Sequence, residues 1–103
     1  MEEKKANREV VHEVIAEIKH RRTNPVEGSY TSYLFREGID KVLKKIGEES
    51  SEVIIGAKNE DKAELTSELS DLIYHSLVLM EIADVDISDV KNEMLKRRGK
   101  VEK

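Results

Sequence analysis

The chain contains no cysteine, a single proline and only four aromatic side chains, three tyrosines and one phenylalanine. The absence of cysteine excludes a disulfide framework and a thiolate metal site, and it suits a reducing cytoplasm. No apolar run approaches the roughly 18 residues that a membrane span requires, and the charged first residues do not resemble a signal peptide. We therefore expect a cytoplasmic protein that does not interact with a membrane.

Charged residues are abundant, at 39% of the chain against roughly 25% in an average domain. The formal net charge of −4 argues against a protein that coats nucleic acid. A chain of 103 residues is expected to form one domain over residues 1–103 with a modest core. A second subunit would help to complete that core.

Apolar residues recur at helical spacing along most of the chain, and no strand pattern or internal repeat is found. The predicted helices span residues 5–21, 39–58, 62–84 and 87–98, and residues 22–38 are predicted to form a loop and a short helical turn. The predicted fold class is therefore all-α, a bundle of about five helices with an antiparallel central pair. Because the helix at 62–84 is apolar on more than one side, we expect dimerisation to complete the bundle.

Capping residues support several of these helix boundaries. Ser29 is expected to cap the short helical turn, and Asp61 to cap the helix that follows it in a capping-box pattern. Gly99 is expected to end the last helix. Gly47 lies inside the apolar phase of residues 39–58, so we expect it to allow close packing and not to stop the helix.

Two pairs of carboxylates have the i, i+3 spacing that places both members on one helix face. The pairs are Glu49-x-x-Glu52 and Glu68-x-x-Asp71. At 100° per residue, the first acid of each pair lies on the shoulder of its helix's apolar stripe and the second lies one step outward. Because two helices joined by a short turn pack antiparallel, the four acids are expected to converge along one edge.

Converging carboxylates repel one another, and a divalent cation would relieve that repulsion. Oxygen ligands favour Mg²⁺, with Mn²⁺ also possible, and Mg²⁺ usually completes its shell with water and phosphate oxygens. A single E-x-x-E pair is more often a solvated helix face, but the doubled motif favours a metal. A di-iron bundle normally uses Glu-x-x-His, and His75 is four residues from Asp71. We therefore interpret His75 as a buried or second-layer histidine and not as a ligand.

Lys41 and Lys45 share the stripe of the acids, where a phosphate chain bound at the metal would pass them. They could equally be solvated surface lysines. A hydroxyl-rich segment and one arginine either contact the substrate or have structural roles, as helix caps, core tyrosines or a partner of the helix dipole. These residues are Ser29, Tyr30, Thr31, Tyr33 and Arg97.

Three motifs together resemble a known family. They are SYTSYLF, then GIDKVLKKIGEESSE, then ELSDLIYH. They are similar to the phosphoribosyl-ATP pyrophosphohydrolases, which belong to the all-α NTP pyrophosphatase (MazG-like) superfamily. The likeness runs from about residue 29 to residue 97. The four acids identify the superfamily, and the flanking residues identify the member. Ser50, Ser51 and Gly56 stand where the pattern has alanine-like residues, a difference that preserves size.

The resemblance implies a five-helix protomer that forms a homodimer. It also implies a Mg²⁺-dependent hydrolase that converts the nucleotide phosphoribosyl-ATP to phosphoribosyl-AMP and pyrophosphate, the second step of histidine biosynthesis. The chain is too short to include the cyclohydrolase to which this activity is often fused, so a stand-alone hydrolase is expected. The implied Mg²⁺ ligands are Glu49, Glu52, Glu68 and Asp71.

The resemblance also suggests catalytic roles. Glu48 is the candidate for orienting the attacking water or acting as general base, although the ligands Glu49 or Glu52 could do so instead. Lys41 and Lys45 would neutralise the departing pyrophosphate. Two other functions stay open: a house-cleaning NTP pyrophosphatase on the same fold, and a non-catalytic helical dimer with a solvated acidic edge.

Overall fold

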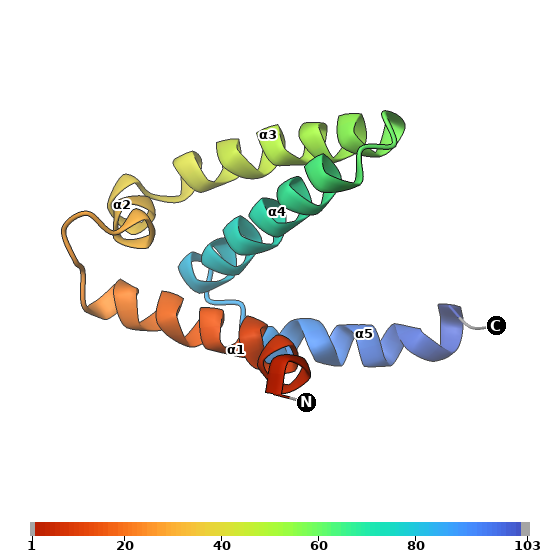
Figure 1. Ribbon diagram of the computed structural model, residues 1–103. Helices are drawn as coiled ribbons and strands as arrows, with labels where there is room; N and C mark the ends of the chain where they lie inside the picture. Colours follow the sequence, from red (N-terminus) through yellow and green to blue (C-terminus); the bar gives the residue numbers. More distant parts are fainter. Residues whose placement is uncertain (1, 102–103) are drawn as a thin grey trace.

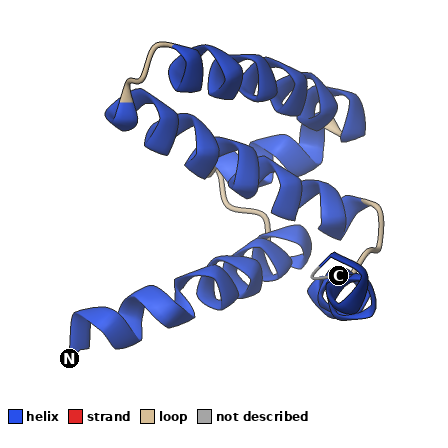
Figure 2. Ribbon diagram, turned by 90° about the vertical axis from the view of Figure 1, so that its right-hand side faces the viewer, coloured by secondary structure: helices blue, strands red, loops and turns tan. Residues whose placement is uncertain are grey.

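The described chain is helical throughout, with short connections and no strand between residues 2 and 101 (Figures 1 and 2). The computed structural model describes the backbone of residues 2–101 and the side chains of residues 9–99. The helices are α1 (Glu2–Thr23), α2 (Tyr30–Glu37), α3 (Ile39–Lys58), α4 (Lys62–Ile82) and α5 (Ile87–Val101). This confirms the all-α class and the five helices. However, α2 has 8 residues and is a true helix, longer than the predicted turn.

The predicted caps are found at the starts of α2 and α4. The Ser29 hydroxyl accepts a hydrogen bond from the backbone N–H of Ser32 at 3.2 Å, and the Asp61 carboxylate accepts one from the N–H of Glu64 at 3.0 Å. Each of these bonds satisfies a backbone donor that the first helical turn cannot pair. The boundaries of α3 are those predicted from the sequence.

The ends of α3 and α4 are formed by non-glycine residues in the left-handed region. Glu60 has φ 55° and Asp84 has φ 57°, and the N–H after each donates back across the helix end, Asp61 to Gly56 and Val85 to Met80. This is the Schellman pattern, which glycine usually provides. It ends α4 two residues before the predicted boundary. The prediction that Gly99 ends the last helix is wrong, because α5 continues through it to Val101.

The hydrophobic core is small and lies where α1, α2, α3 and α4 meet. Its buried apolar residues are Ile18, Leu34, Val42, Leu77 and Val78, and Leu34, Val42 and Val78 have no exposed surface. Because α2 contributes Leu34 directly to this core, the helix is anchored beside α3 and α4. The hydroxyl-rich segment of α2 is thereby held next to the acid-bearing helices.

An ion-pair cluster joins the end of α1 to the end of α4. The Glu81 carboxylate accepts from Lys19 Nζ at 2.9 Å and from Arg22 Nη1 at 3.1 Å. Partial burial acts to raise the pKa of Glu81, but the hydrogen bonds from Lys19 and Arg22 outweigh it and the pKa is lowered. The cluster fixes the scaffold and lies away from the acid motifs.

A glycine of α3 does pack tightly against α4, but it is not the one expected. A β-carbon at Gly56 would lie 3.3 Å from both Cα and N of Leu65, whereas a β-carbon at Gly47 would meet nothing within 4 Å. Gly47 is inside α3 as predicted, but its expected role in close packing is wrong. Gly56 instead allows the two backbones to touch just beside the turn that connects them.

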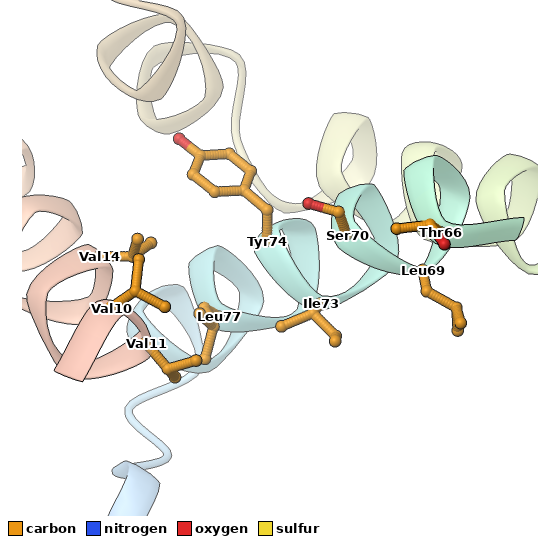
Figure 3. Close-up of a pocket in the computed structure, with 9 residues that line it drawn as sticks. All are labelled: Val10, Val11, Val14, Thr66, Leu69, Ser70, Ile73, Tyr74 and Leu77. Carbon is orange, nitrogen blue, oxygen red and sulfur yellow. The ribbon is translucent and has the colours of Figure 1, made fainter. Parts of the chain in front are cut away.

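An apolar groove opens between α1 and α4 (Figure 3). Val10 and Val11 are 46% and 42% exposed on the α1 side, and Leu69 and Ile73 are 40% and 52% exposed on the α4 side. In Figure 3 these α4 side chains point away from α2. Large apolar side chains exposed in one groove are typical of an interaction surface.

Candidate metal and phosphate site

Three carboxylates from α3 and α4 come together beside the Gly56 contact. One oxygen each from Glu52, Glu64 and Glu68 lies within 4.8 Å of those of the other two. None of the three forms an ion pair with a cationic side chain in the part of the chain that the structure describes. Their negative charge is therefore not neutralised by any described side chain.

The negative charges of the neighbouring acids act on Glu68. Its pKa is raised, first by partial desolvation and then by the negative charges of Glu64, Asp71, Glu52 and Glu49. All four acids predicted from the sequence thus belong to one electrostatic group, with Glu64 added. A hard divalent cation matches such an all-oxygen donor set.

Two of the four predicted ligands lie in the cluster and two lie beside it. Glu52 and Glu68 are within ligand distance of each other. Glu49 is buried and gives one oxygen to His75, with Nδ1 to Oε1 at 2.7 Å. Asp71 is exposed, and its backbone oxygen lies 3.0 Å from the same Nδ1.

Glu64 is the acid that the sequence reasoning missed. The capping-box pattern that begins at Asp61 includes Glu64 only as its fourth residue, and the backbone N–H of Glu64 does bond to the Asp61 cap. Its side chain turns to the cluster instead. The spacing of four residues between Glu64 and Glu68, which places both on one helix face, was a usable signal.

His75 connects the acids to α2. The histidine is 5% exposed, which confirms the prediction of a buried histidine. Its Nε2 lies 2.7 Å from the hydroxyl of Tyr30. Tyr30 is 45% exposed, and its ring stacks on that of Tyr33 with 6.0 Å between the centroids. The pKa of Tyr30 is raised, mainly by burial of its hydroxyl and then by the charge of Glu49.

The hydroxyl-rich segment mostly bonds within the protein. Ser29 caps α2, Thr31 bonds to the hydroxyl of Tyr74, and Tyr30 bonds to His75. These contacts support the structural roles that were left open for these residues. Tyr30 is exposed and Tyr33 is half-buried, so among these residues Tyr30 leaves the most room for a ligand.

Of the two candidate phosphate-binding lysines, Lys41 is close to the tyrosines of α2. Lys41 Nζ lies 5.8 Å from the Tyr33 ring centroid, and Arg36 is 5.4 Å from the same centroid. Neither Lys41 nor Lys45 has an ion-pair partner among the described side chains. Both lysines are on α3, where Lys45 precedes Glu49 by four residues and Lys41 precedes it by eight.

The other two candidates are exposed on their helices. Glu48 is exposed on α3 beside Glu49 and has no described ion pair. Arg97 is on α5 and donates to Glu93 at 2.7 Å, while α5 extends away from α3 (Figure 1). Within one chain, the structure therefore does not bring Arg97 to the acids.

No helix in the described part of the chain is long and apolar enough to cross a membrane. The family model of phosphoribosyl-ATP pyrophosphohydrolase matches residues 11–98. This range includes every candidate site residue discussed above.

Relatives with curated names are similar over most of the chain. A phosphoribosyl-ATP pyrophosphatase from Listeria innocua is 51% identical over 94 residues, which cover 91% of this chain and 90% of the relative. A phosphoribosyl-ATP pyrophosphatase from Clostridium botulinum is 55% identical over 84 residues, covering 82% and 76%.

Longer relatives match as well. The histidine biosynthesis bifunctional protein HisIE from Oceanobacillus iheyensis is 64% identical over 89 residues, which cover 86% of this chain but 41% of the relative. The protein of the same name from Caldanaerobacter subterraneus is 50% identical over 92 residues, which cover 89% of this chain and 45% of the relative. The chain thus spans less than half the length of these bifunctional proteins.

Proposed function

Because this chain belongs to the phosphoribosyl-ATP pyrophosphohydrolase family, we propose that it hydrolyses phosphoribosyl-ATP to phosphoribosyl-AMP and pyrophosphate. This reaction is the second step of histidine biosynthesis. The observation that carries the proposal is the 51% identity to a phosphoribosyl-ATP pyrophosphatase over nine-tenths of both chains. The cytoplasmic location expected from the sequence belongs to the same proposal.

The acid cluster is proposed to hold Mg²⁺, or Mn²⁺ in its place. The fit rests on three carboxylate oxygens within 4.8 Å of one another and on the absence of a described cationic partner. Glu52, Glu64 and Glu68 would hold the ion together with the predicted ligand Glu49, whose charge acts on Glu68, and the predicted ligand Asp71 borders them. When bound, the cation would neutralise charge on the phosphates of the substrate.

The remaining site residues have proposed roles in the same hydrolysis. A carboxylate, Glu48 or one of the neighbouring acids, would orient the water that attacks the phosphoanhydride. The leaving pyrophosphate gains negative charge as its bond to phosphorus breaks. Lys41 and Lys45 would balance that charge, since no described acid competes for them.

A homodimer built around an antiparallel α3–α4 pair is proposed as the working assembly. The exposed surface of the chain is 7960 Å², whereas a folded monomer of this mass exposes about 5,900 Å². A dimer interface of standard size, with about 800 Å² buried on each partner, would remove roughly two fifths of this excess. The apolar groove between α1 and α4 supplies suitable side chains for it.

The activity is tested by measuring pyrophosphate release from phosphoribosyl-ATP and from a panel of NTPs and dNTPs, with Mg²⁺ and with EDTA. We expect Mg²⁺-dependent release that is fastest from phosphoribosyl-ATP. Release from dNTPs alone would instead support the house-cleaning pyrophosphatase. No release from any nucleotide would support a non-catalytic dimer.

A further inference from the structure

A hydrogen-bond chain links three helices through the buried edge of the acid site. Tyr30 on α2 bonds to Nε2 of His75 on α4 at 2.7 Å, and Nδ1 of the same histidine bonds to Oε1 of Glu49 on α3 at 2.7 Å. His75 is 5% exposed and Glu49 is 9% exposed. In the described chain, His75 is thus the side chain that connects Glu49 to α2.

The neighbours of His75 determine where its protons lie. Nδ1 faces the Glu49 carboxylate and also the backbone oxygen of Asp71 at 3.0 Å. A carbonyl oxygen and an ionised carboxylate can only accept, so Nδ1 must carry a hydrogen. In the neutral imidazole, Nε2 then accepts from the Tyr30 hydroxyl. Both ring nitrogens of His75 thus have a defined partner, and such a network specifies one orientation of its members.

The hydrogen-bond chain uses only one of the two carboxylate oxygens of Glu49 and leaves the other able to bind a ligand. Oε1 is bonded to His75, and Oε2 has no hydrogen bond within the described chain. No buried side-chain oxygen among the described residues lacks a partner. Oε2 therefore keeps contact with solvent, although the rest of Glu49 is buried.

We propose that Tyr30 and His75 are positioning residues that lock Glu49 so that Oε2 is presented to the divalent cation. In this role His75 and Tyr30 act through Glu49 and contact neither the metal nor the substrate. The inference rests on the proposed function only in that Glu49 contacts the cation. Outer partners of this kind typically change metal affinity about 10–100-fold when they are removed.

Two substitutions of His75 by an amide side chain distinguish a residue that orients Glu49 from one that only fills space. The amide of His75→Asn reaches about the place of Nδ1 and keeps a donor for Glu49. The longer His75→Gln reaches about the place of Nε2, so it keeps a partner for Tyr30 but loses the donor for Glu49. Tyr30→Phe removes only the outer hydroxyl. The matched control is Tyr74→Phe, which removes the hydroxyl that bonds to Thr31 in the same aromatic cluster.

The measurement is the affinity for Mn²⁺ alone, by electron paramagnetic resonance without nucleotide, on variants whose helical content and melting match the wild type. We expect His75→Gln to bind about 10–100-fold more weakly and His75→Asn to stay within about threefold of the wild type. Tyr30→Phe should lose about 3–10-fold, and Tyr74→Phe should bind as the wild type does.

Equal losses in His75→Asn and His75→Gln would overturn the inference, because they would show that His75 only fills space. Wild-type binding no tighter than that of Glu49→Gln would also overturn it, since Glu49 would then not contact the cation. If no variant at position 75 folds, the comparison of Mn²⁺ affinity between Tyr30→Phe and Tyr74→Phe tests the inference by itself. A Tyr30→Phe variant with higher KM but unchanged Mn²⁺ affinity would make Tyr30 a substrate contact only.

The proposed function fails separately from this inference. Wild-type protein that binds Mn²⁺ in the expected His75-dependent way but does not cleave phosphoribosyl-ATP would refute the substrate and leave the positioning chain intact. If the protein cleaves phosphoribosyl-ATP but the His75 variants bind Mn²⁺ as the wild type does, the positioning chain is refuted and the proposed function stands.

Discussion

Gly56 on α3 and Leu65 on α4 mark the point where the two helix backbones meet, since a β-carbon at position 56 would lie 3.3 Å from Leu65 Cα. The contact is tight against backbone atoms, which cannot move aside as a side-chain end can. Gly56 follows Glu52 by four residues on α3, and Leu65 directly follows Glu64 on α4. We conclude that this contact determines how closely the acids approach.

Substitution of alanine at the two glycines of α3 should have different effects. Gly47→Ala should stabilise the protein by about 1 kcal/mol, the helix-propensity difference at an open site. Gly56→Ala gains the same propensity but forces the helices apart, and overpacking typically costs about 1–3 kcal/mol. Urea unfolding of both variants measures the difference. Equal stabilisation by the two substitutions would contradict the close contact.

A glycine at Glu60 should stabilise the turn between α3 and α4. Glu60 has φ 55°, and a left-handed residue other than glycine costs roughly 1–2 kcal/mol. Glu60→Gly should therefore raise the free energy of unfolding by about 1 kcal/mol. Asn59→Gly is the control, because Asn59 has φ −84° and its substitution should not stabilise. The prediction fails if both glycines lower the melting temperature.

Removing the charge of Glu68 should stabilise the metal-free protein and impair the enzyme. Because the folded-state pKa of Glu68 is raised, its contribution to stability is present below pH about 4.5 and is lost as pH rises through the raised value. In EDTA, Glu68→Gln should therefore be more stable than the wild type at pH 7. That advantage should shrink at acidic pH in thermal melts.

The same variant should lose stabilisation by Mg²⁺ and lose turnover by more than the roughly 10–100-fold typical of outer partners. Glu13→Gln, an exposed acid on α1, should change neither property. Marked destabilisation of metal-free Glu68→Gln would argue that the acid cluster is a structural network and not a cation site.

A charge in the apolar groove should disrupt the proposed dimer. Ile73 is 52% exposed on α4, and an unpaired lysine buried at an interface is strongly unfavourable. Ile73→Lys should weaken self-association by about 30-fold or more, the effect of a hot-spot residue. Analytical ultracentrifugation measures this, and circular dichroism checks that helical content is kept. A wild type that is monomeric at 100 μM, about the upper range of weak association, would remove the basis for the prediction.

Local sequence features were sufficient to locate the helices. The boundaries of α3 follow from an apolar phase that Gly47 does not interrupt, and Ser29 and Asp61 cap the helices that follow them. Helix ends were predicted less well. A glycine at the end of a helix usually adopts the left-handed conformation, but here Glu60 and Asp84 adopt it. Gly99, which was expected to end the last helix, remains helical.

The i, i+3 spacing of the acid motifs correctly placed Glu52 and Glu68 on facing edges. It gave no information on the distance between the two helices or on side-chain rotamers. The helices diverge from their connecting turn (Figure 1), so an acid near the turn, Glu64, enters the cluster. Asp71, further along α4, stays outside it.

The sequence by itself thus determined the helices, the acidic edge and the family, because each depends on residue types at fixed local spacing. Only the tertiary structure decided which acids meet and that His75 joins Glu49 to Tyr30. Those contacts depend on the packing of α3 against α4 at Gly56 and on the burial of Leu34 of α2 in the core. Residues that are 26 or 45 positions apart in the chain meet only through that packing.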